Sequence, residues 1–333
     1  MDSEKKLAVI ILNWNGEKLL KKFLPSVVRY TSDPEVEIVV ADNGSDDASV
    51  EFIKANYPEV RLFTFDKNYG FAEGYNKAIE AVMLPYTILL NSDVEVSQGW
   101  WQPMLKFMEE NPDVGALQPK IKSYQDKTMF EYAGAAGGFL DILGYPYCRG
   151  RLFDRIEKDN GQYDGHAEDV CWASGAALMV RTSLYLDLGG LDPLFFAHME
   201  EIDLCCRMLN AGYRICAISD SEVYHVGGGS LAQGNPKKTY LNFRNNLLLL
   251  HKNLPTSRGK KILFLRRLAD SLAFFMFLAK RDIPNARAIL KAHADFRKMK
   301  GNYPSPGNKN KIKKFPGSNR FIVLDRYLLN KKK

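Results

Sequence analysis

Residues 87–95 combine a strand-like run with side chains that could bind a metal-bound phosphate ligand. The apolar first half of this segment ends abruptly at Asn91-Ser92-Asp93. Open α/β sheets bind their ligands in crevices at the carboxyl ends of strands. Asp93 could hold a divalent cation against a nucleotide diphosphate there, although an aspartate that follows a strand is also a common helix cap.

Three other polar segments follow apolar runs and would supply the remaining contacts of such a site. Asp42 could accept hydrogen bonds from a base or a ribose, and the glycines after Asn68 permit close approach of the backbone to a ligand. Taken alone, each segment is also typical of a turn or of a loop before a helix. The three segments are Asn13-Trp14-Asn15, Asp42-Asn43-Gly44-Ser45 and residues 68–76.

An acidic cluster and a histidine in the second half of the chain are further candidates. Glu200, Glu201 and Asp203 open a segment with helical spacing. An acidic start stabilises a helix through its dipole, and Asp203 could pair with Arg207 one turn later. His225 follows a strand-like run and precedes three glycines that would let the chain approach a diphosphate; alone, a histidine is more often structural than a ligand.

The elements that must position these residues alternate between strands and helices. This β-α-β-α order predicts an α/β fold with a doubly wound, mostly parallel sheet. Continuous apolar runs are what burial on both faces of such a sheet requires. The predicted strands are 7–12, 36–41, 60–65 and 86–90, and the predicted helices include 19–24, 47–55 and 74–82.

The rest of the chain is less regular. Residues 120–170 predict either a long loop region or a β-rich insertion over the site. Further on we predict a buried segment at 171–180, helices at 200–210, 240–253 and 260–281, and a loose stretch at 301–314.

Composition and cysteine usage narrow the class of protein. Hydrophobic residues make up 46% and charged residues 26% of the 333 positions, as in soluble globular proteins. We expect no signal peptide, because residues 1–6 run straight into a strand-like segment. We expect no transmembrane helix, because no apolar run reaches about 18 residues. The five cysteines form no C-x-x-C pair, which argues against a zinc ribbon or a disulfide framework and suits a reducing cytosol.

Charge is distributed unevenly along the chain. Residues 1–232 hold 21 Lys and Arg against 35 Asp and Glu, whereas residues 233–333 hold 25 against 4. Within the basic region, residues 260–281 carry a broad apolar face between the cations Arg266-Arg267 and Lys280-Arg281. This pattern favours an anionic membrane surface as a partner. The alternative is a helical pair that packs on the acidic body. Nucleic acid is an unlikely partner because no recognition motif is present.

The order and spacing of all these segments resemble the family 2 inverting glycosyltransferases, which have the GT-A fold. The matching segments are 10–15, 39–45, 68–76, 89–93, 172–181 and 196–207. Within that family the chain is most similar to the rhamnosyltransferase-like branch, which builds bacterial surface polysaccharides. The resemblance implies a catalytic domain over 1–232, with a donor-nucleotide half at 1–118 and an acceptor half at 119–232, and then a basic, mostly helical region at 233–333.

The resemblance also implies roles for the strand-end residues. Asp42 would contact the nucleoside, and Asn68 and Gly70 would line the donor pocket. The full donor-binding set is Asn13, Asn15, Asp42, Asn43, Asn68, Gly70, Asn76, Asn91 and Ser92.

A divalent cation is part of this implied site. Asp93 and His225 would bind the cation that bridges the diphosphate. Asn91 stands where many relatives have aspartate, and its amide oxygen is a weaker ligand that still suits Mg²⁺ or Mn²⁺. An imidazole ligand tilts the preference toward Mn²⁺.

Inverting sugar transfer requires a base that takes the proton of the acceptor hydroxyl. By the resemblance, Glu201 aligns with that base, one methylene longer than the commoner aspartate, and Glu200 is the alternative. Asp203 could orient the acceptor. Trp172 could stack on a sugar or acceptor beside Gly175, or it could be buried core.

Together these features imply a metal-dependent glycosyltransferase in bacterial surface polysaccharide synthesis, at the inner face of the cytoplasmic membrane. The donor would be dTDP-rhamnose or a UDP-sugar, and the acceptor a glycan or a lipid-linked glycan. The unusual Asn91 and Glu201 keep open a non-catalytic glycan- or nucleotide-sugar-binding assembly subunit on the same fold. A sugar nucleotidyltransferase is less favoured, because Asn13-Trp14-Asn15-Gly16 replaces its Gly-rich, basic loop.

Overall fold

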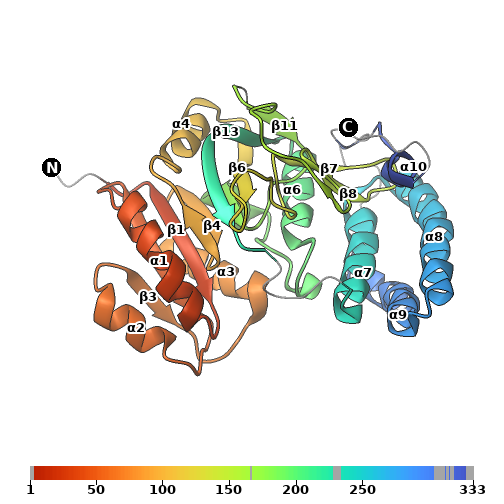
Figure 1. Cartoon of the computed structure of the whole chain (residues 1–333), viewed down its shortest axis with the longest axis horizontal. Helices are drawn as coiled ribbons and strands as arrows, with labels where there is room; N and C mark the ends of the chain where they lie inside the picture. Colours follow the sequence, from red (N-terminus) through yellow and green to blue (C-terminus); the bar gives the residue numbers. More distant parts are fainter. Residues whose placement is uncertain are drawn as a thin grey trace.

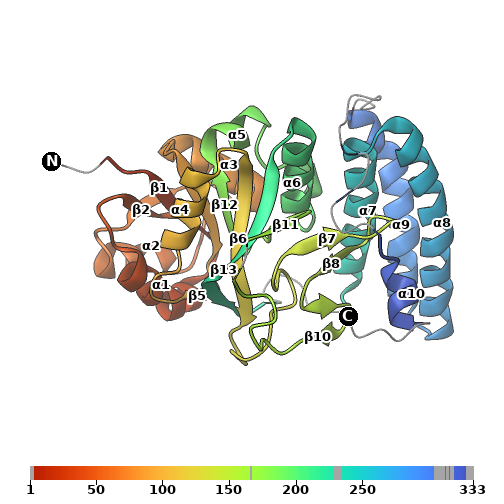
Figure 2. The same cartoon turned by 90° about the horizontal axis from the view of Figure 1, so that it is seen from above.

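An α/β body and a bundle of C-terminal helices lie side by side in the computed structural model of the chain (Figure 1, Figure 2). The structure describes residues 4–165, 167–227, 234–303, 312, 315 and 319–327. Gly228 and Gly229 of the glycine run, most of the predicted loose stretch at 301–314 and the terminal lysines 331–333 lie outside the described residues.

The body is built on one mixed sheet. Among the described residues its strands are β1 (Leu7–Asn13), β2 (Val36–Asp42), β3 (Arg61–Thr64), β4 (Tyr86–Asn91), β5 (Val94–Val96), β6 (Val114–Ser123), β11 (Glu168–Val170), β12 (Ala177–Arg181) and β13 (Arg214–His225). Their order is β11-β13-β6-β12-β4-β1-β2-β3, with β5 paired to β13. Strands β5, β11 and β12 run against the others, so the sheet is mostly parallel, as predicted.

Helices cover both faces of this sheet, which explains the continuous apolar runs. In β1, Leu7 and Val9 pack toward one face and Ala8 and Ile10 toward the other, and all four are fully buried. The first face is covered by α1 (Glu17–Thr31), α2 (Ser49–Asn56) and α4 (Gln102–Glu110). The second is covered by α3 (Gly70–Val82), α5 (Thr182–Asp187) and α6 (Glu200–Ala211).

The irregular region after β6 is a β-rich insertion, the second of the two alternatives. It forms a small antiparallel sheet of β7 (Gly138–Leu140), β8 (Pro146–Cys148), β9 (Arg151–Leu152) and β10 (Arg155–Ile156). Strands β7 and β8 reach from the body toward the helical bundle (Figure 2). The division between donor and acceptor halves expected after residue 118 falls inside β6.

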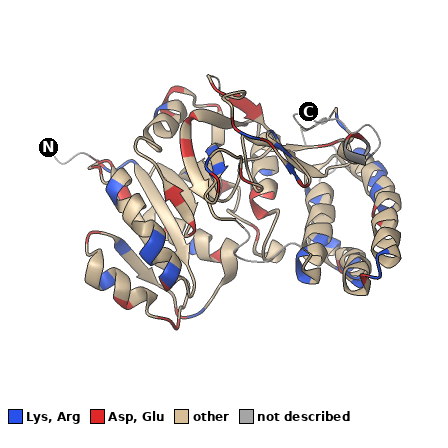
Figure 3. Cartoon of the chain, viewed as in Figure 1, with Lys and Arg blue, Asp and Glu red and all other residues tan. Residues whose placement is uncertain are grey.

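The bundle consists of α7 (Pro236–Asn253), α8 (Thr256–Ala279) and α9 (Ile283–Met299), with the short α10 (Ile322–Tyr327) nearby. Helix α9 was not predicted, because three of its buried positions, Ala286, Ala288 and Ala292, are alanines that give a weak hydrophobic period. Lys and Arg dominate the charged positions of the bundle, whereas Asp and Glu are concentrated in the body (Figure 3). None of the helices in the described part of the chain is both long and apolar enough to span a bilayer.

Candidate active site

The carboxyl ends of β1, β2 and β4 meet at one edge of the sheet. The parallel register pairs Asn13 with Asp42 and Leu12 with Asn91. The fourth polar segment joins them through Asn68, whose side chain accepts a hydrogen bond from Asn43 at 3.1 Å. The convergence of the four segments that strand order predicted is therefore present in the structure.

Asp42 is the centre of a buried hydrogen-bond network at this edge. Its Oδ2 accepts from Asn13 Nδ2 at 2.9 Å and from the Ser45 hydroxyl at 2.6 Å, and its Oδ1 accepts from Ser45 N at 2.9 Å. The backbone N–H of Asn15 donates to the Ser45 hydroxyl at 2.9 Å. The side chain of Asp42 is thus fixed in one orientation before any ligand binds, and the buried Asn13 Oδ1 has no partner.

Asn43 holds the loop that leads into α3. Its Oδ1 accepts from Tyr69 N at 2.9 Å, and its Nδ2 donates to Gly70 O at 3.0 Å. Asn68 Oδ1 accepts from Gly70 N at 2.7 Å, which forms a turn directly before α3, and the helix begins at Gly70 rather than at the predicted residue 74. A Cβ added at Gly70 would meet nothing within 4 Å, so open space borders the start of this helix, where backbone N–H groups favour phosphate.

Two members of the predicted donor set lie apart from this network. Asn76 uses its whole amide within the protein: Nδ2 donates to Leu191 O at 2.8 Å, and Oδ1 accepts from Tyr185 Oη and Leu191 N. Asn76 therefore ties α3 to the loop before α6. Ser92 is partly exposed in the turn between β4 and β5.

Asp93 and His225 come together through pairing of β5 with β13. His225 Nε2 lies 3.1 Å from Asp93 Oδ1, and its Nδ1 lies 3.5 Å from Glu131 Oε2. Although burial alone would lower it, the nearby carboxylates of Asp93 and Glu131 raise the pKa of His225 to about 10. Asn91 Nδ2 approaches the same imidazole at 3.5 Å. Glu131 was not predicted, because it lies in the irregular insertion with no local pattern around it.

This cluster suits a cation that takes further ligands from elsewhere. A carboxylate oxygen and an imidazole nitrogen are ligands that first-row divalent metals accept. Within the described residues, no three His, Cys, Asp or Glu side chains are arranged to hold a metal by themselves. Asp93 and His225 could therefore supply two protein ligands, with oxygens of a diphosphate completing the coordination.

Glu200 and Glu201 begin α6 with carboxylates that are poorly satisfied. The Oε2 atom of each is buried without a hydrogen-bond partner. Burial, offset in part by backbone N–H groups at the helix start, raises the pKa of Glu201 to about 7. Burial and the neighbouring Glu201 also raise the pKa of Glu200. A purely structural acidic helix start would be solvated, so this pair fits proton transfer near neutral pH better.

Gly175 lies between Glu201 and the start of α3. A Cβ built on Gly175 would lie 3.7 Å from Glu201 Cβ and 3.7 Å from Phe71 Cζ. Phe71 is the second residue of α3, next to Gly70. Glu201 therefore lies near the start of α3, next to the edge where β1, β2 and β4 end.

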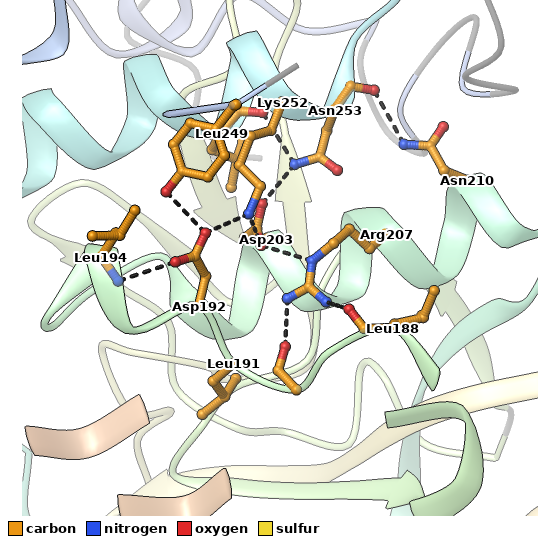
Figure 4. Close-up of polar contacts among 12 residues, drawn as sticks. Leu188, Leu191, Asp192, Leu194, Asp203, Arg207, Asn210, Leu249, Lys252 and Asn253 are labelled. Carbon is orange, nitrogen blue, oxygen red and sulfur yellow. Dashed lines mark hydrogen bonds and ion pairs between the residues drawn. The ribbon is translucent and has the colours of Figure 1, made fainter. Parts of the chain in front are cut away.

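Asp203 is fully buried and bound to cations rather than open to a ligand (Figure 4). Its Oδ2 accepts from Arg207 Nε at 2.8 Å and from Lys252 Nζ at 2.9 Å, and Asn253 donates to its Oδ1. Burial opposes ionisation, but Arg207 and Lys252 hold the pKa of Asp203 below its usual value. The pairing with Arg207 is thus observed, and an acceptor-orienting role would have to act through these partners.

Trp172 belongs to the hydrophobic core. Its side chain is packed against Gly138, and its indole N–H donates to Phe139 O at 3.0 Å. The residue is 3% exposed. The sequence left open whether Trp172 stacks on a sugar or acceptor or belongs to the core, and the structure shows it in the core.

Comparisons with known proteins agree with this geometry. Residues 8–175 match the model of the family "Glycosyl transferase family 2". The chain is 28% identical over 240 residues to an N-acetylglucosaminyl-diphospho-decaprenol L-rhamnosyltransferase of Mycobacterium tuberculosis, covering 66% of this chain and 75% of the relative. It is 24% identical over 214 residues to the rhamnosyltransferase WbbL of Escherichia coli K12, covering 62% and 78%.

Solved structures share the fold at lower identity. GalNAc-T7 with UDP, GalNAc and Mn²⁺ matches with a TM-score of 0.61 and 15% identity, over 92% of this chain and 59% of that one. The Staphylococcus aureus TarS fragment 1–349 with UDP-GlcNAc matches with a TM-score of 0.58 and 18% identity, over 87% and 80%. A mannosyltransferase of Pyrobaculum calidifontis with GDP-Man and Mn²⁺ matches with a TM-score of 0.53 and 14% identity, over 91% and 77%. These structures have the GT-A fold.

Proposed function

The chain belongs to glycosyl transferase family 2, and on that premise we propose that it moves a sugar, with inversion, from a nucleotide-diphosphate donor to a glycan or lipid-linked acceptor of a bacterial surface polysaccharide. The observation that carries the proposal is the position of Glu201. Its side chain lies beside Gly175, which also borders Phe71 at the start of α3, and its Oε2 is buried without a hydrogen-bond partner.

The donor would lie along the ends of β1, β2 and β4. Asp42, held by Asn13 and Ser45, would accept hydrogen bonds from the nucleoside. The open space at Gly70 and the amide groups at the start of α3 would receive phosphate oxygens.

Asp93 and His225 would hold a divalent cation, with Asn91 as a weaker neighbour. A bound cation would neutralise the charge that develops on the leaving diphosphate. The imidazole favours Mn²⁺ over Mg²⁺, and two of the structures with the same fold contain Mn²⁺. His225 would have to lose its proton when the cation binds, because an imidazole is a metal ligand only in its neutral form.

Glu201 would act as the base. Its carboxylate takes the proton of the acceptor hydroxyl while that oxygen forms a bond to the anomeric carbon. The bond from that carbon to the diphosphate oxygen breaks, and the electron pair leaves with the nucleoside diphosphate. A carboxyl pKa of about 7 makes Glu201 a stronger base than an ordinary glutamate while it is still ionised near neutral pH.

The sugar and the acceptor are proposed from the relatives. Two of the most similar curated relatives are rhamnosyltransferases, and one of these is named for a diphospho-decaprenol acceptor. We therefore propose dTDP-rhamnose as the first donor to test and a lipid-diphosphate-linked sugar as the acceptor.

The bundle offers a surface for a membrane that carries such an acceptor. One face of α8 exposes six large apolar side chains: Phe264, Leu265, Leu268, Leu272, Phe275 and Met276. This face lies between Lys260 and Lys261 at one end and Lys280 and Arg281 at the other, an arrangement typical of helices in a membrane interface. Arg266, expected to flank the face, is instead buried and paired with Asp270. The membrane surface would be the inner face of the cytoplasmic membrane.

Binding and turnover test the proposal in two steps. Thermal stabilisation by nucleoside diphosphates and their sugars, with and without Mn²⁺, should select one nucleotide and require the metal. Glu201→Gln should keep this stabilisation and lose transfer to a lipid-linked acceptor. Binding without turnover on any acceptor would favour the non-catalytic assembly subunit, and full activity of Glu201→Gln would remove Glu201 as the base.

A further inference from the structure

The segment just before Glu200 has an unusual backbone. It follows a short 3₁₀ helix, η1 (Pro193–Phe195). Phe196 has φ 67° and ψ −56°, and Ala197 N donates to Phe195 O at 2.8 Å, which is the rare and strained form of the γ-turn. His198 and Met199 also have positive φ, 68° and 76°. Such conformations in residues other than glycine persist only when surrounding groups hold them in place.

Helix α7 supplies those groups. The Nδ2 of the fully buried Asn245 lies 2.9 Å from Phe195 O, 2.9 Å from Ala197 O and 2.8 Å from His198 O. Because all three neighbours are carbonyl acceptors, the amide NH₂, and not its oxygen, must face the loop. Arg244 donates to Phe195 O at 2.9 Å and, through its Nε, to Asn245 Oδ1 at 2.8 Å. Two adjacent residues of α7 thus contact three carbonyls of segment 195–199, those of Phe195, Ala197 and His198.

We propose that Asn245 is a positioning residue for sugar transfer, supported by Arg244, and that it holds segment 195–199 in the conformation that aims Glu200 and Glu201 at the acceptor. Met199 O accepts the first backbone hydrogen bond of α6 from Asp203 N. The path of this segment therefore sets where the first turn of α6, with both glutamates, lies against Gly175. The inference rests on the proposed function, because it takes one of these glutamates as the base.

The adjacent residue offers a matched control. Asn246 is the same residue type on the same helix and is 2% exposed. Its Nδ2 donates to Gly144 O at 2.7 Å, and its Oδ1 accepts from Arg266. Asn246 therefore fastens the bundle to the β7–β8 hairpin and not to the loop before α6. Loss of either amide removes comparable buried hydrogen bonds, but only Asn245 reaches the strained segment.

The experiment compares Asn245→Ala, Asn246→Ala and Glu201→Gln in the full chain. Steady-state transfer gives kcat and the donor KM, and calorimetric titration with the nucleoside diphosphate and Mn²⁺ gives the fraction of binding-competent protein. We expect Asn245→Ala to lower kcat per competent site on the order of 100-fold, the effect of a displacement of about 1 Å at a catalytic group. Its donor KM should not change, and Asn246→Ala should keep the wild-type kcat per competent site.

Each outcome bears on one of the two proposals. If Asn245→Ala and Asn246→Ala have equal kcat per competent site, Asn245 only stabilises the fold and the inference is wrong. If Glu201→Gln is fully active, the base assignment fails, whatever Asn245 does. Should Asn245→Ala not fold, Arg244→Gln removes the guanidinium contacts to the same loop and should show a smaller fall in kcat at unchanged donor KM; an unchanged kcat would overturn the inference.

Discussion

Replacing Glu201 by glutamine should stabilise the fold at alkaline pH while it removes activity. A carboxyl with a pKa of about 7 when folded, against 4.5 when unfolded, destabilises the native state at pH 8 by roughly 3 kcal/mol. Because the side chain is partly exposed, solvent screening reduces this to about 1–2 kcal/mol. Glutamine has nearly the same shape as glutamate but no charge. The substitution therefore removes the cost of holding an ionised carboxyl in the folded state, and the fold becomes more stable.

The sign and the pH window follow from the raised pKa. The penalty is fully present above about pH 7, where the folded-state carboxyl is ionised. At pH 5 that carboxyl keeps its proton, and the penalty falls to about a quarter of its value at pH 8. Thermal unfolding should therefore show Glu201→Gln with a Tm about 1.5–3 °C above wild type at pH 8 and a much smaller difference at pH 5.

Asp203→Asn is the matched control, because it removes a carboxylate from the same helix with the opposite shift. Because the pKa of Asp203 is lower in the folded state, its carboxylate stabilises the fold at pH values above its unfolded pKa. This stabilisation is lost as pH falls through the folded-state pKa. Asp203→Asn should therefore unfold at a lower temperature than wild type at pH 8. If the buried pairs with Arg207 and Lys252 are broken, its free energy of unfolding should fall by about 3 kcal/mol. A Tm of Glu201→Gln at or below wild type at pH 8 would refute the raised pKa. Transfer by Glu201→Gln should be lower by about 10²–10⁴-fold.

Three further predictions concern other parts of the molecule. His225→Ala should abolish the Mn²⁺-dependent part of thermal stabilisation by the nucleoside diphosphate; stabilisation that still depends on Mn²⁺ would exclude His225 as a ligand. Gly175→Ala should fold normally, because its added Cβ would make ordinary contacts at 3.7 Å, and should raise the acceptor KM without changing the donor KM; equal effects on both would place Gly175 outside the acceptor site. Leu268→Gln with Leu272→Gln should reduce co-sedimentation with phosphatidylglycerol vesicles and leave transfer to a soluble acceptor unchanged, whereas equal binding to these vesicles would argue against the exposed face of α8 as the membrane contact.

The convergence of the strand ends could be predicted because their polar residues follow uninterrupted apolar strands. Asn13, Asp42 and Asp93 each come within two residues of a strand end, so the parallel order alone brought their segments together. Glu131 could not be found this way, because it lies in the insertion and reaches His225 only through tertiary packing.

The roles of several buried residues also could not be predicted from the sequence. Asp203 was predicted to orient the acceptor, but its carboxylate binds Lys252 and Asn253 of α7, residues about fifty positions later in the chain. The spacing of Trp172 fits either a sugar platform or the core, and only the position of Gly138 against its indole decides between them. Asn245 carries no local signal, since its three partners are main-chain carbonyls.

Strand β12 has a consequence for how the chain is made. It lies between β4 and β6 in the sheet, although it follows both in the sequence. As a nascent chain leaves the ribosome, one edge of β4 and one edge of β6 stay unpaired until residue 181 has been synthesised and β12 is complete. Unpaired apolar strand edges pair readily with strands of other chains. A fragment that stops before β12 should therefore aggregate rather than form a smaller nucleotide-binding unit.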